Sequence, residues 1–148
     1  MLKVIKTAGV VAAVVLLLHC NQGATAQDLP SAIRLSKSEQ FAPAATMFKQ
    51  LIAQNPADGD NYYYYGLSTM KKYYSDTLNV SFDEKADSAR AIFELGIRQD
   101  PANPLNLVGL GALDLIRKDM AAARTDFDKA LALLPSKANK QIKMAPDR

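Results

Sequence analysis

Three stretches of this sequence align without gaps and predict its fold: FAPAATMFKQLIAQNP (41–56), ADSARAIFELGIRQDP (86–101) and MAAARTDFDKALALLP (120–135). Each contains a small alanine, a phenylalanine four residues later and a proline at its end. The equivalent residues are Ala44, Ala89 and Ala123; Phe48, Phe93 and Phe127; and Pro56, Pro101 and Pro135. All three sets are spaced by 45 and then 34 residues, so we interpret the stretches as copies of one structural unit.

Each copy predicts an amphipathic helix that ends before its proline. The alanine lets a neighbouring helix approach closely, and the phenylalanine one turn later fills the space between the two helices. Proline has no N–H to continue a helix, and it disfavours helical geometry in the residue before it. We therefore expect Phe93 and Phe127 in the core.

A second helix is predicted ahead of each copy. Tyr65-Gly66 lies 45 residues before Leu110-Gly111, and each glycine follows the preceding proline by 10 residues. A large residue followed by glycine favours a helix against whose backbone a partner packs tightly. Asn103-Pro104 provides an N-cap with proline in the first turn. The sequence therefore predicts an all-α fold, with about six helices in three antiparallel pairs and no sheet.

These residues resemble the tetratricopeptide repeat (TPR), a helix–turn–helix unit of 34 residues. The repeats would cover about 27–58, 59–102 and 104–137, followed by a basic tail, 138–148. The last repeat fits best and departs at Asp114, where an aromatic residue is usual, and at Met120. The resemblance implies a short α-solenoid, a curved stack of helix pairs whose concave surface binds proteins.

The two earlier repeats fit the pattern less well. The middle repeat departs at Thr69 and holds 11 additional residues, about 71–81, between its helices. Its capping box, Ser81 to Glu84, predicts an early start of the second helix. The insertion is either a surface elaboration without a role or an aromatic hairpin that contacts a partner. The first repeat matches only in its second helix, because Ser31-Ala32 stands where Leu-Gly is expected.

The N-terminal segment 1–26 predicts a secretory signal peptide. Lys3 and Lys6 precede an uncharged, apolar run at 8–18, and Ala24-Thr25-Ala26 has the pattern of a cleavage site. The run is shorter than the roughly 20 residues that span a bilayer. We expect cleavage before Gln27 and a soluble periplasmic or secreted product.

A lipoprotein is the alternative. Leu17-Leu18-His19-Cys20 resembles the lipobox of bacterial lipoproteins, although His19 occupies a place normally held by a small residue. Lipidation at Cys20 would anchor the chain to a membrane, and it is the one membrane association that the sequence suggests.

The mature chain would lack the residues of several catalytic and metal sites. Its one histidine and one cysteine fall in the removed segment, so it could form no disulfide, thiol nucleophile, His-based triad or Cys/His zinc site. The acidic residues form no convincing catalytic pair, and 58–61 lacks the ligands of a calcium loop. We expect no enzyme activity, cofactor or metal. With 18 basic and 15 acidic residues, less Lys3 and Lys6, the net charge of +1 indicates no nucleic-acid partner.

The tyrosine run NYYYYGL (61–67) is predicted to be mainly scaffold. Helical spacing places Tyr62 and Tyr65 on the face that packs against the partner helix, and Tyr63 on another side with Leu67 and Met70. The resemblance to the TPR implies that this other side is the concave, ligand-facing one. A stacking platform for bases or sugars is the alternative that we consider less favoured. The predicted partner-binding residues, which share the concave surface, are Tyr63, Leu67, Met70, Leu105, Val108 and Leu115.

The sequence thus favours a non-catalytic binding or assembly scaffold of the bacterial cell envelope. Its partner would be an extended or helical protein segment in an apolar concave groove, within a larger envelope complex or alone. The alternatives are an outer-membrane-associated lipoprotein subunit and a truncated part of a longer TPR array, because the end after Pro135 has no clear capping helix. An enzyme acting on cell-wall material is the least favoured hypothesis.

Overall fold

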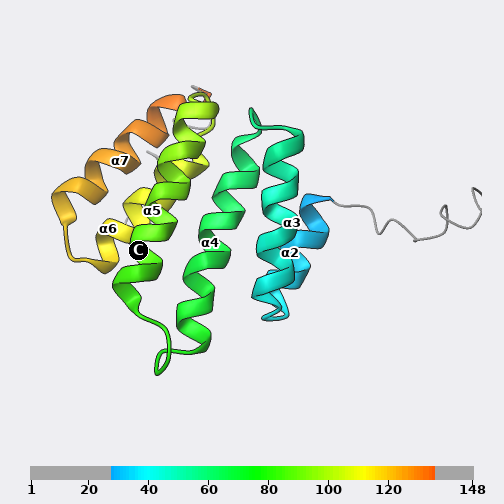
Figure 1. Cartoon of the computed structure of the whole chain (residues 1–148). Helices are drawn as coiled ribbons and strands as arrows, with labels where there is room; N and C mark the ends of the chain where they lie inside the picture. The colour runs from blue at the N-terminus through cyan, green and yellow to red at the C-terminus, as the bar shows by residue number, and fades with distance from the viewer. Residues whose placement is uncertain (1–27, 136–148) are drawn as a thin grey trace, which may run out of the picture.

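The computed structural model describes residues 28–135, which form six α-helices and contain no strand (Figure 1). The helices in chain order are α2 Leu29–Lys37, α3 Phe41–Gln54, α4 Gly59–Ser75, α5 Phe82–Gln99, α6 Leu105–Ile116 and α7 Met120–Leu133. The expectation of an all-α fold built from packed helix pairs is confirmed for this part of the chain. The predicted signal peptide, Cys20, the predicted cleavage site before Gln27 and the tail 138–148 lie outside the described residues.

The prolines and the capping box mark helix boundaries as predicted, whereas the N-cap of α6 is Pro104 and not Asn103 as predicted. The three proline-terminated helices α3, α5 and α7 each end two residues before their proline. Ser81 caps α5 as predicted, since its Oγ accepts a hydrogen bond from the backbone N–H of Glu84 at 3.4 Å. Residues 71–75 extend α4, so α4 and α5 form the longest pair.

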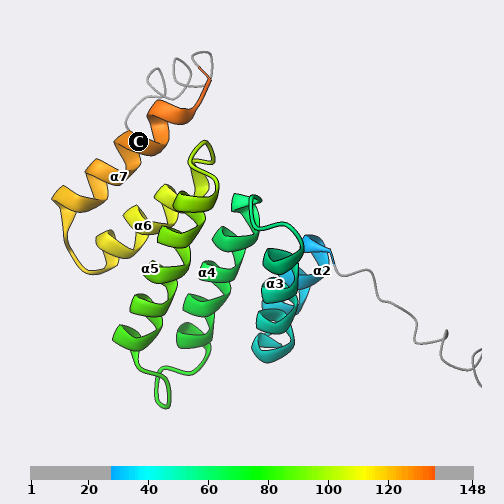
Figure 2. The ribbon, with the colours of Figure 1, turned by 45° about the horizontal axis from the view of Figure 1, so that its top comes forward.

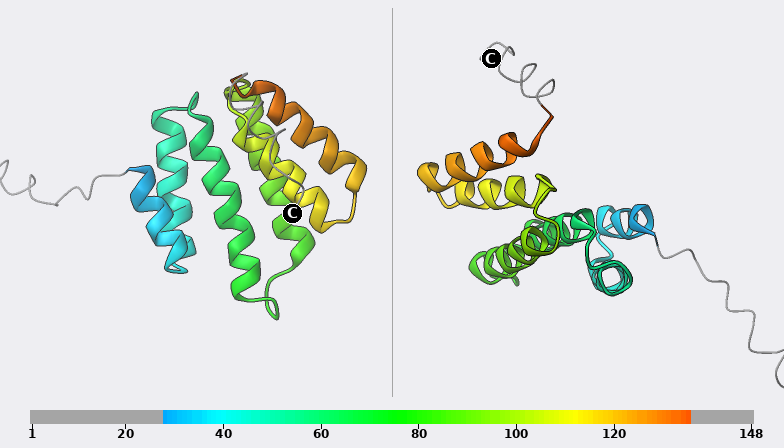
Figure 3. Two further views of the ribbon diagram at one scale, coloured as in Figure 1. Left: turned by 180° about the vertical axis from the view of Figure 1, so that it is seen from behind. Right: turned by 90° about the horizontal axis from the view of Figure 1, so that it is seen from above.

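Three helix pairs follow one another along the molecule: α2 with α3, α4 with α5, and α6 with α7 (Figure 2). α4 also contacts both α2 and α6, so the first helices of the three pairs lie side by side. Each second helix packs on the first helix of the next pair, as α3 does on α4 and α5 on α6 (Figure 3). The row α2, α4 and α6 therefore forms one face of the molecule.

The connection between the two helices has the same backbone conformation in the first pair, α2–α3, and in the last pair, α6–α7. These two connections are called the corners. Glu39 and Lys118 have φ angles of 60° and 63°, in the left-handed region, each two residues beyond its helix. The following N–H, of Gln40 or Asp119, donates to a carbonyl five residues earlier at 2.9 Å. This is the Schellman arrangement, which satisfies the last carbonyls of a helix. Both connections lie five residues before the alanine of the following helix, Ala44 or Ala123, so the first and last helix pairs share this backbone feature.

The core consists of two clusters. One surrounds Phe93, which is 1% exposed; its other members are Met70, Ala86, Ala89, Leu110 and Leu113. The other contains Ala32, Ala44, Phe48 and Leu51. The repeat alanines are buried and Phe93 is in the core, as predicted.

Two core predictions are wrong. Phe127 is half-buried, because no described helix covers the outer side of α7. Tyr65 is also half-buried, and its ring stacks on Phe48 with the ring centroids 5.8 Å apart. Tyr62 is buried as expected, and its hydroxyl donates to the carbonyl of Pro56 at 2.9 Å.

Polar contacts fix the second pair to the third. Asn106 is fully buried, and its Nδ2 donates to the carbonyl of Gly59 at 2.9 Å. Arg90 on α5 pairs with Asp114 on α6, and Asp114 is 4% exposed. This ion pair joins α5 to α6 at a position where the Asp114 side chain is largely withdrawn from solvent.

Candidate functional site

The six residues predicted to bind a partner have very different exposure. Met70 is 6% exposed and belongs to the Phe93 cluster, so the expectation of Met70 on an open surface is wrong. Tyr63 and Leu67 are half-buried and pack against that same cluster. Leu105 and Val108 are half-buried, whereas Leu115 is 44% exposed. Partner contact by these residues stays a prediction.

The α2–α4 face has a small hollow of about 140 Å³. Leu67 and Tyr64 of α4 line it, together with Ile33, Ser36 and Lys71. Leu67 is therefore the one residue of the predicted six that borders this hollow. Leu67 and Tyr64 both line it from α4.

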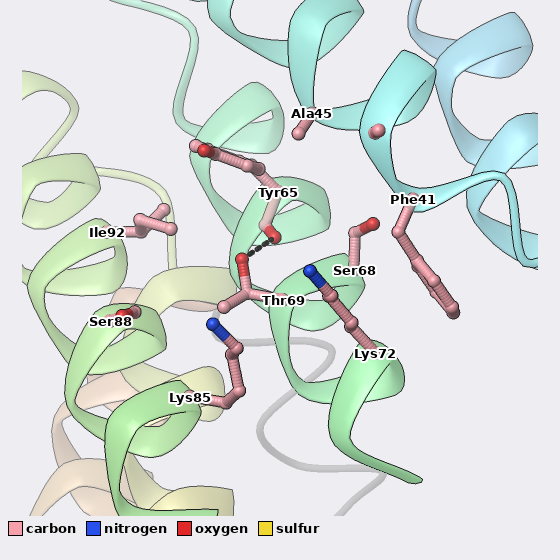
Figure 4. A pocket seen from close by; sticks show the side chains of 10 residues that line it. Phe41, Ala45, Tyr65, Ser68, Thr69, Lys72, Lys85, Ser88 and Ile92 are labelled. Atoms are coloured by element: carbon pink, nitrogen blue, oxygen red, sulfur yellow. Dashed lines mark hydrogen bonds between the residues drawn. The ribbon is translucent and has the colours of Figure 1, made fainter. Parts of the chain in front are cut away.

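A larger hollow lies beside the first, between α3 and α5, and Ser68 of α4 lines both (Figure 4). Its volume is about 240 Å³. Its lining residues come from all three helices: Phe41, Ala42 and Ala45 from α3; Tyr65, Ser68, Thr69 and Lys72 from α4; and Lys85, Ser88 and Ile92 from α5.

A second hollow of about 200 Å³ continues the first, because Tyr65 and Ile92 line both. Its remaining lining residues are Lys49, Ile52, Tyr62 and Leu95. We call the two hollows together the α3–α5 groove. α4 forms its floor, and α3 and α5 form its walls.

Helical spacing explains why these residues lie in one groove. On α5 the lining residues are Lys85, Ser88, Ile92 and Leu95, which recur at intervals of three or four. The alanine and phenylalanine of the same helix, Ala89 and Phe93, belong to the buried face instead. Each wall helix therefore buries one stripe in the core and presents a neighbouring stripe to the groove.

The groove has a polar end and an apolar end. Lys72 and Lys85 extend from α4 and α5 towards Thr69 at the polar end (Figure 4). Ile52, Ile92 and Leu95 line the other end. No aspartate or glutamate lines either hollow, so the charged groups in the groove walls are all lysines.

The lysines at the polar end already stabilise one neighbouring carboxylate. Lys85 Nζ donates to Glu84 Oε1 at 2.5 Å, and this bond lowers the pKa of the Glu84 carboxyl below its usual value. The positive charge of Lys72 lowers that pKa further. Glu84 is exposed on α5 and outside the groove lining, so this end of the groove retains an excess of positive charge.

Two of the hydroxyl groups in the groove make bonds within their own helices. Thr69 Oγ1 donates to the carbonyl of Tyr65 at 3.0 Å, and Ser88 Oγ donates to the carbonyl of Glu84 at 2.7 Å. The groove therefore offers few free donors to a bound molecule, besides the lysine ammonium groups.

Sequence reasoning missed this groove. It assigned Tyr65 to the core and did not single out Ile92, Leu95 or the two lysines. The sequence did contain a signal for the α5 wall of the groove. Residues 85, 88, 92 and 95 recur at helical spacing, next to the stripe formed by Ala89 and Phe93. That series shows which residues share a face, but the separation of α3 from α5 depends on the tertiary packing.

No protein-family model matches this chain, and a comparison with curated proteins finds no match either. Within residues 28–135, no helix has the length and apolar character needed to cross a membrane. The same residues contain no cluster of three or more acidic, histidine or cysteine side chains placed to hold a metal ion.

Proposed function

We propose that this protein is a non-catalytic protein-binding module of the bacterial cell envelope, built as a short TPR-like solenoid. The observation that carries the proposal is the α3–α5 groove, which combines apolar walls with lysines and is open to solvent. Grooves between helices are common sites for segments of partner proteins. The binding surface that we propose thus differs from the concave surface expected from the sequence.

The solenoid interpretation rests on the recurrence of one unit. The alanine and proline positions repeat, the first helices form a continuous row, and the corners at Glu39 and Lys118 match. Stacked helix pairs of this kind bury a continuous core and leave extended surfaces for binding.

Export to the periplasm or cell surface is proposed from the sequence alone. The basic start, the apolar run and Ala24-Thr25-Ala26 support it. The intact mass of protein from fractionated envelopes tests it. A chain that begins at Gln27 is expected, and a lipid-modified N-terminal Cys20 would favour the lipoprotein alternative.

A second candidate is that the chain is part of a longer array or is covered by a partner at its α6–α7 end. Large apolar side chains are exposed there, including Leu115, Ile116, Met120 and Leu133, which are 40–59% exposed. Solenoids need a polar cap on each end, and these residues do not form one.

Crosslinking in cells tests the binding function. A photoreactive amino acid at Ser88, in the groove, should yield discrete crosslinked products with a partner. The same amino acid at Asp128, on the exposed side of α7, is the matched control and should not yield those products. Equal products at both positions would contradict binding in the groove.

A further inference from the structure

The dimensions of the α3–α5 groove limit what can bind in it. The floor residues run from Tyr62 to Lys72 along one helix, and at 1.5 Å per residue this corresponds to about 15 Å. A bound helix of about ten residues, or three turns, would fill that length, whereas an extended strand would need only about four or five residues.

The hydrogen-bonding groups of the groove favour a helix over an extended strand. An extended segment leaves backbone N–H and C=O groups that need partners, and these groups are costly to bury without them. The walls are helices, whose backbone groups are bonded internally, and the hydroxyls of Thr69 and Ser88 are bonded to their own helices. A helical segment satisfies its own backbone and presents only side chains to the groove.

The charge of the groove favours an acidic partner. Its lining includes Lys49, Lys72 and Lys85 and no acidic residue. The C-terminal tail of the chain is a poor candidate for this groove, because 138–148 carries Lys140, Lys143 and Arg148 against the single acidic side chain of Asp147. Like charges would oppose its binding near the lysines.

From these observations we propose that the α3–α5 groove binds an amphipathic helix of another protein, about three turns long, with acidic side chains beside Lys72 and Lys85 and apolar side chains against Ile52, Ile92 and Leu95. This proposal rests on the proposed binding function and specifies its partner. Apolar residues of the partner at i, i+3, i+4 and i+7 would occupy the groove, and its carboxylates would lie at the polar end.

A library of random 16-residue peptides displayed on phage, selected on the full chain, tests the proposal. Two groove-filling variants, Ala42→Trp and Ser88→Trp, identify the peptides that bind in the groove; both residues are exposed, and circular dichroism checks that the variants fold. We expect groove-dependent peptides to share an apolar stripe of helical period with aspartate or glutamate at one end.

Charge reversal then tests the role of the lysines. The double variant Lys72→Glu/Lys85→Glu should weaken the selected peptides by about tenfold or more and should select basic peptides instead. Lys71→Glu is the matched control, since Lys71 is exposed on α4 outside the groove, and it should change affinity by about twofold at most.

The outcomes separate this inference from the function on which it rests. Groove-dependent peptides are those whose binding is lost in the tryptophan variants. If these peptides lack acidic residues, or if the double charge reversal leaves their affinity unchanged, the partner is not acidic, but the binding function is unaffected. Groove-dependent peptides that tolerate proline in their central turn would overturn the helical partner. If no selected peptide is sensitive to either tryptophan variant, both the inference and the binding role of the groove are wrong.

Discussion

The backbone of Gly66 on α4 lies directly against the ring of Phe93 on α5. A Cβ at residue 66 would overlap carbons of that ring. Gly109 on α6 meets the same ring, since a Cβ there would lie 2.7 Å from Phe93 Cε1. Phe93 is thus held between glycines of two neighbouring helix pairs, and a single side chain sets the spacing of α4 and α6.

Alanine at either of these glycines should therefore destabilise the fold. The methyl group would overpack a buried ring, which costs about 1–3 kcal/mol, although alanine's higher helix propensity offsets up to about 1 kcal/mol. Gly111→Ala is the matched control, because its neighbour Phe127 is half-buried and can move. Urea denaturation should show Gly66→Ala and Gly109→Ala to be less stable than Gly111→Ala. Equal stability of all three variants would show that Phe93 shifts freely.

The same glycines show how far the sequence predicts this fold. Repetition of alanine, phenylalanine and proline at fixed spacings predicted the helix pairs, because each residue type has one dominant local effect. Gly66 and Gly111 were predicted as points of close approach, but Gly109 was not, since it contacts the preceding pair rather than its own partner helix. Contacts between repeats depend on their relative rotation, which local periodicity does not specify.

The candidate site was less predictable for the same reason. The pattern placed Tyr65 on the face towards α5, yet its ring packs on Phe48 of α3 and borders the groove. Phe127 illustrates the role of a neighbouring helix, because its position in the repeat matches that of Phe93, yet among the described helices none packs on the outer side of α7.

Replacing Asp114 should show the importance of its ion pair with Arg90. Asp114 is buried, and its removal would leave the Arg90 guanidinium, whose side chain is 29% exposed, without its partner. We expect Asp114→Ala to lower the free energy of unfolding by about 1–3 kcal/mol. Asp87→Ala removes the neighbouring pair with Arg117, in which Asp87 is 69% exposed, and should cost about 0–1 kcal/mol. Equal losses in chemical denaturation would contradict the importance of burial.

Glycine at the two left-handed corners should stabilise the protein. Glu39 and Lys118 have positive φ angles, which side chains with a Cβ disfavour and glycine adopts readily. Glu39→Gly and Lys118→Gly should each raise the free energy of unfolding by about 0.5–1 kcal/mol, after the entropy of the unfolded chain is included. Ser38→Gly is the control, because Ser38 has a φ of −88° and gains nothing from glycine. Thermal melts in which all three variants lose stability would contradict the corner geometry.

Alkaline pH should destabilise the fold through Tyr62. Burial raises the pKa of the Tyr62 hydroxyl above its usual value, so the folded state retains this proton at a pH where the unfolded chain releases it. Its contribution is fully present below about pH 10, the pKa of an unfolded tyrosine, and is lost as the pH rises through the folded pKa. Tyr62→Phe should cost about 0.5–1.5 kcal/mol at neutral pH, because the bond to Pro56 is lost.

The difference between Tyr62→Phe and the parent protein should then shrink above about pH 10. Unfolding free energies at pH 7 and at several values above pH 10 measure this convergence. Burial also raises the pKa of the Tyr63 hydroxyl, so the variant should retain some alkaline destabilisation of its own. A difference that stays constant with pH would show that the Tyr62 hydroxyl titrates alike in the folded and unfolded chains.

The last prediction distinguishes the two neighbouring tyrosines of the 61–67 run. The Tyr63 ring lies 6.2 Å from that of Phe93, measured between centroids, and packs against the core, whereas Tyr65 borders both hollows of the groove. Tyr63→Ala should lower the free energy of unfolding by about 1–3 kcal/mol and leave the affinity of groove-binding peptides unchanged in the folded protein. Tyr65→Ala should weaken those peptides by about tenfold or more, because large aromatic residues at the centre of a groove are frequent hot spots. Thermal melts and peptide titrations well below both melting temperatures separate stability from binding. If Tyr63→Ala weakens binding more than Tyr65→Ala while its melting temperature is unchanged, the partner binds on the concave side of α4 and the α3–α5 groove is not the site.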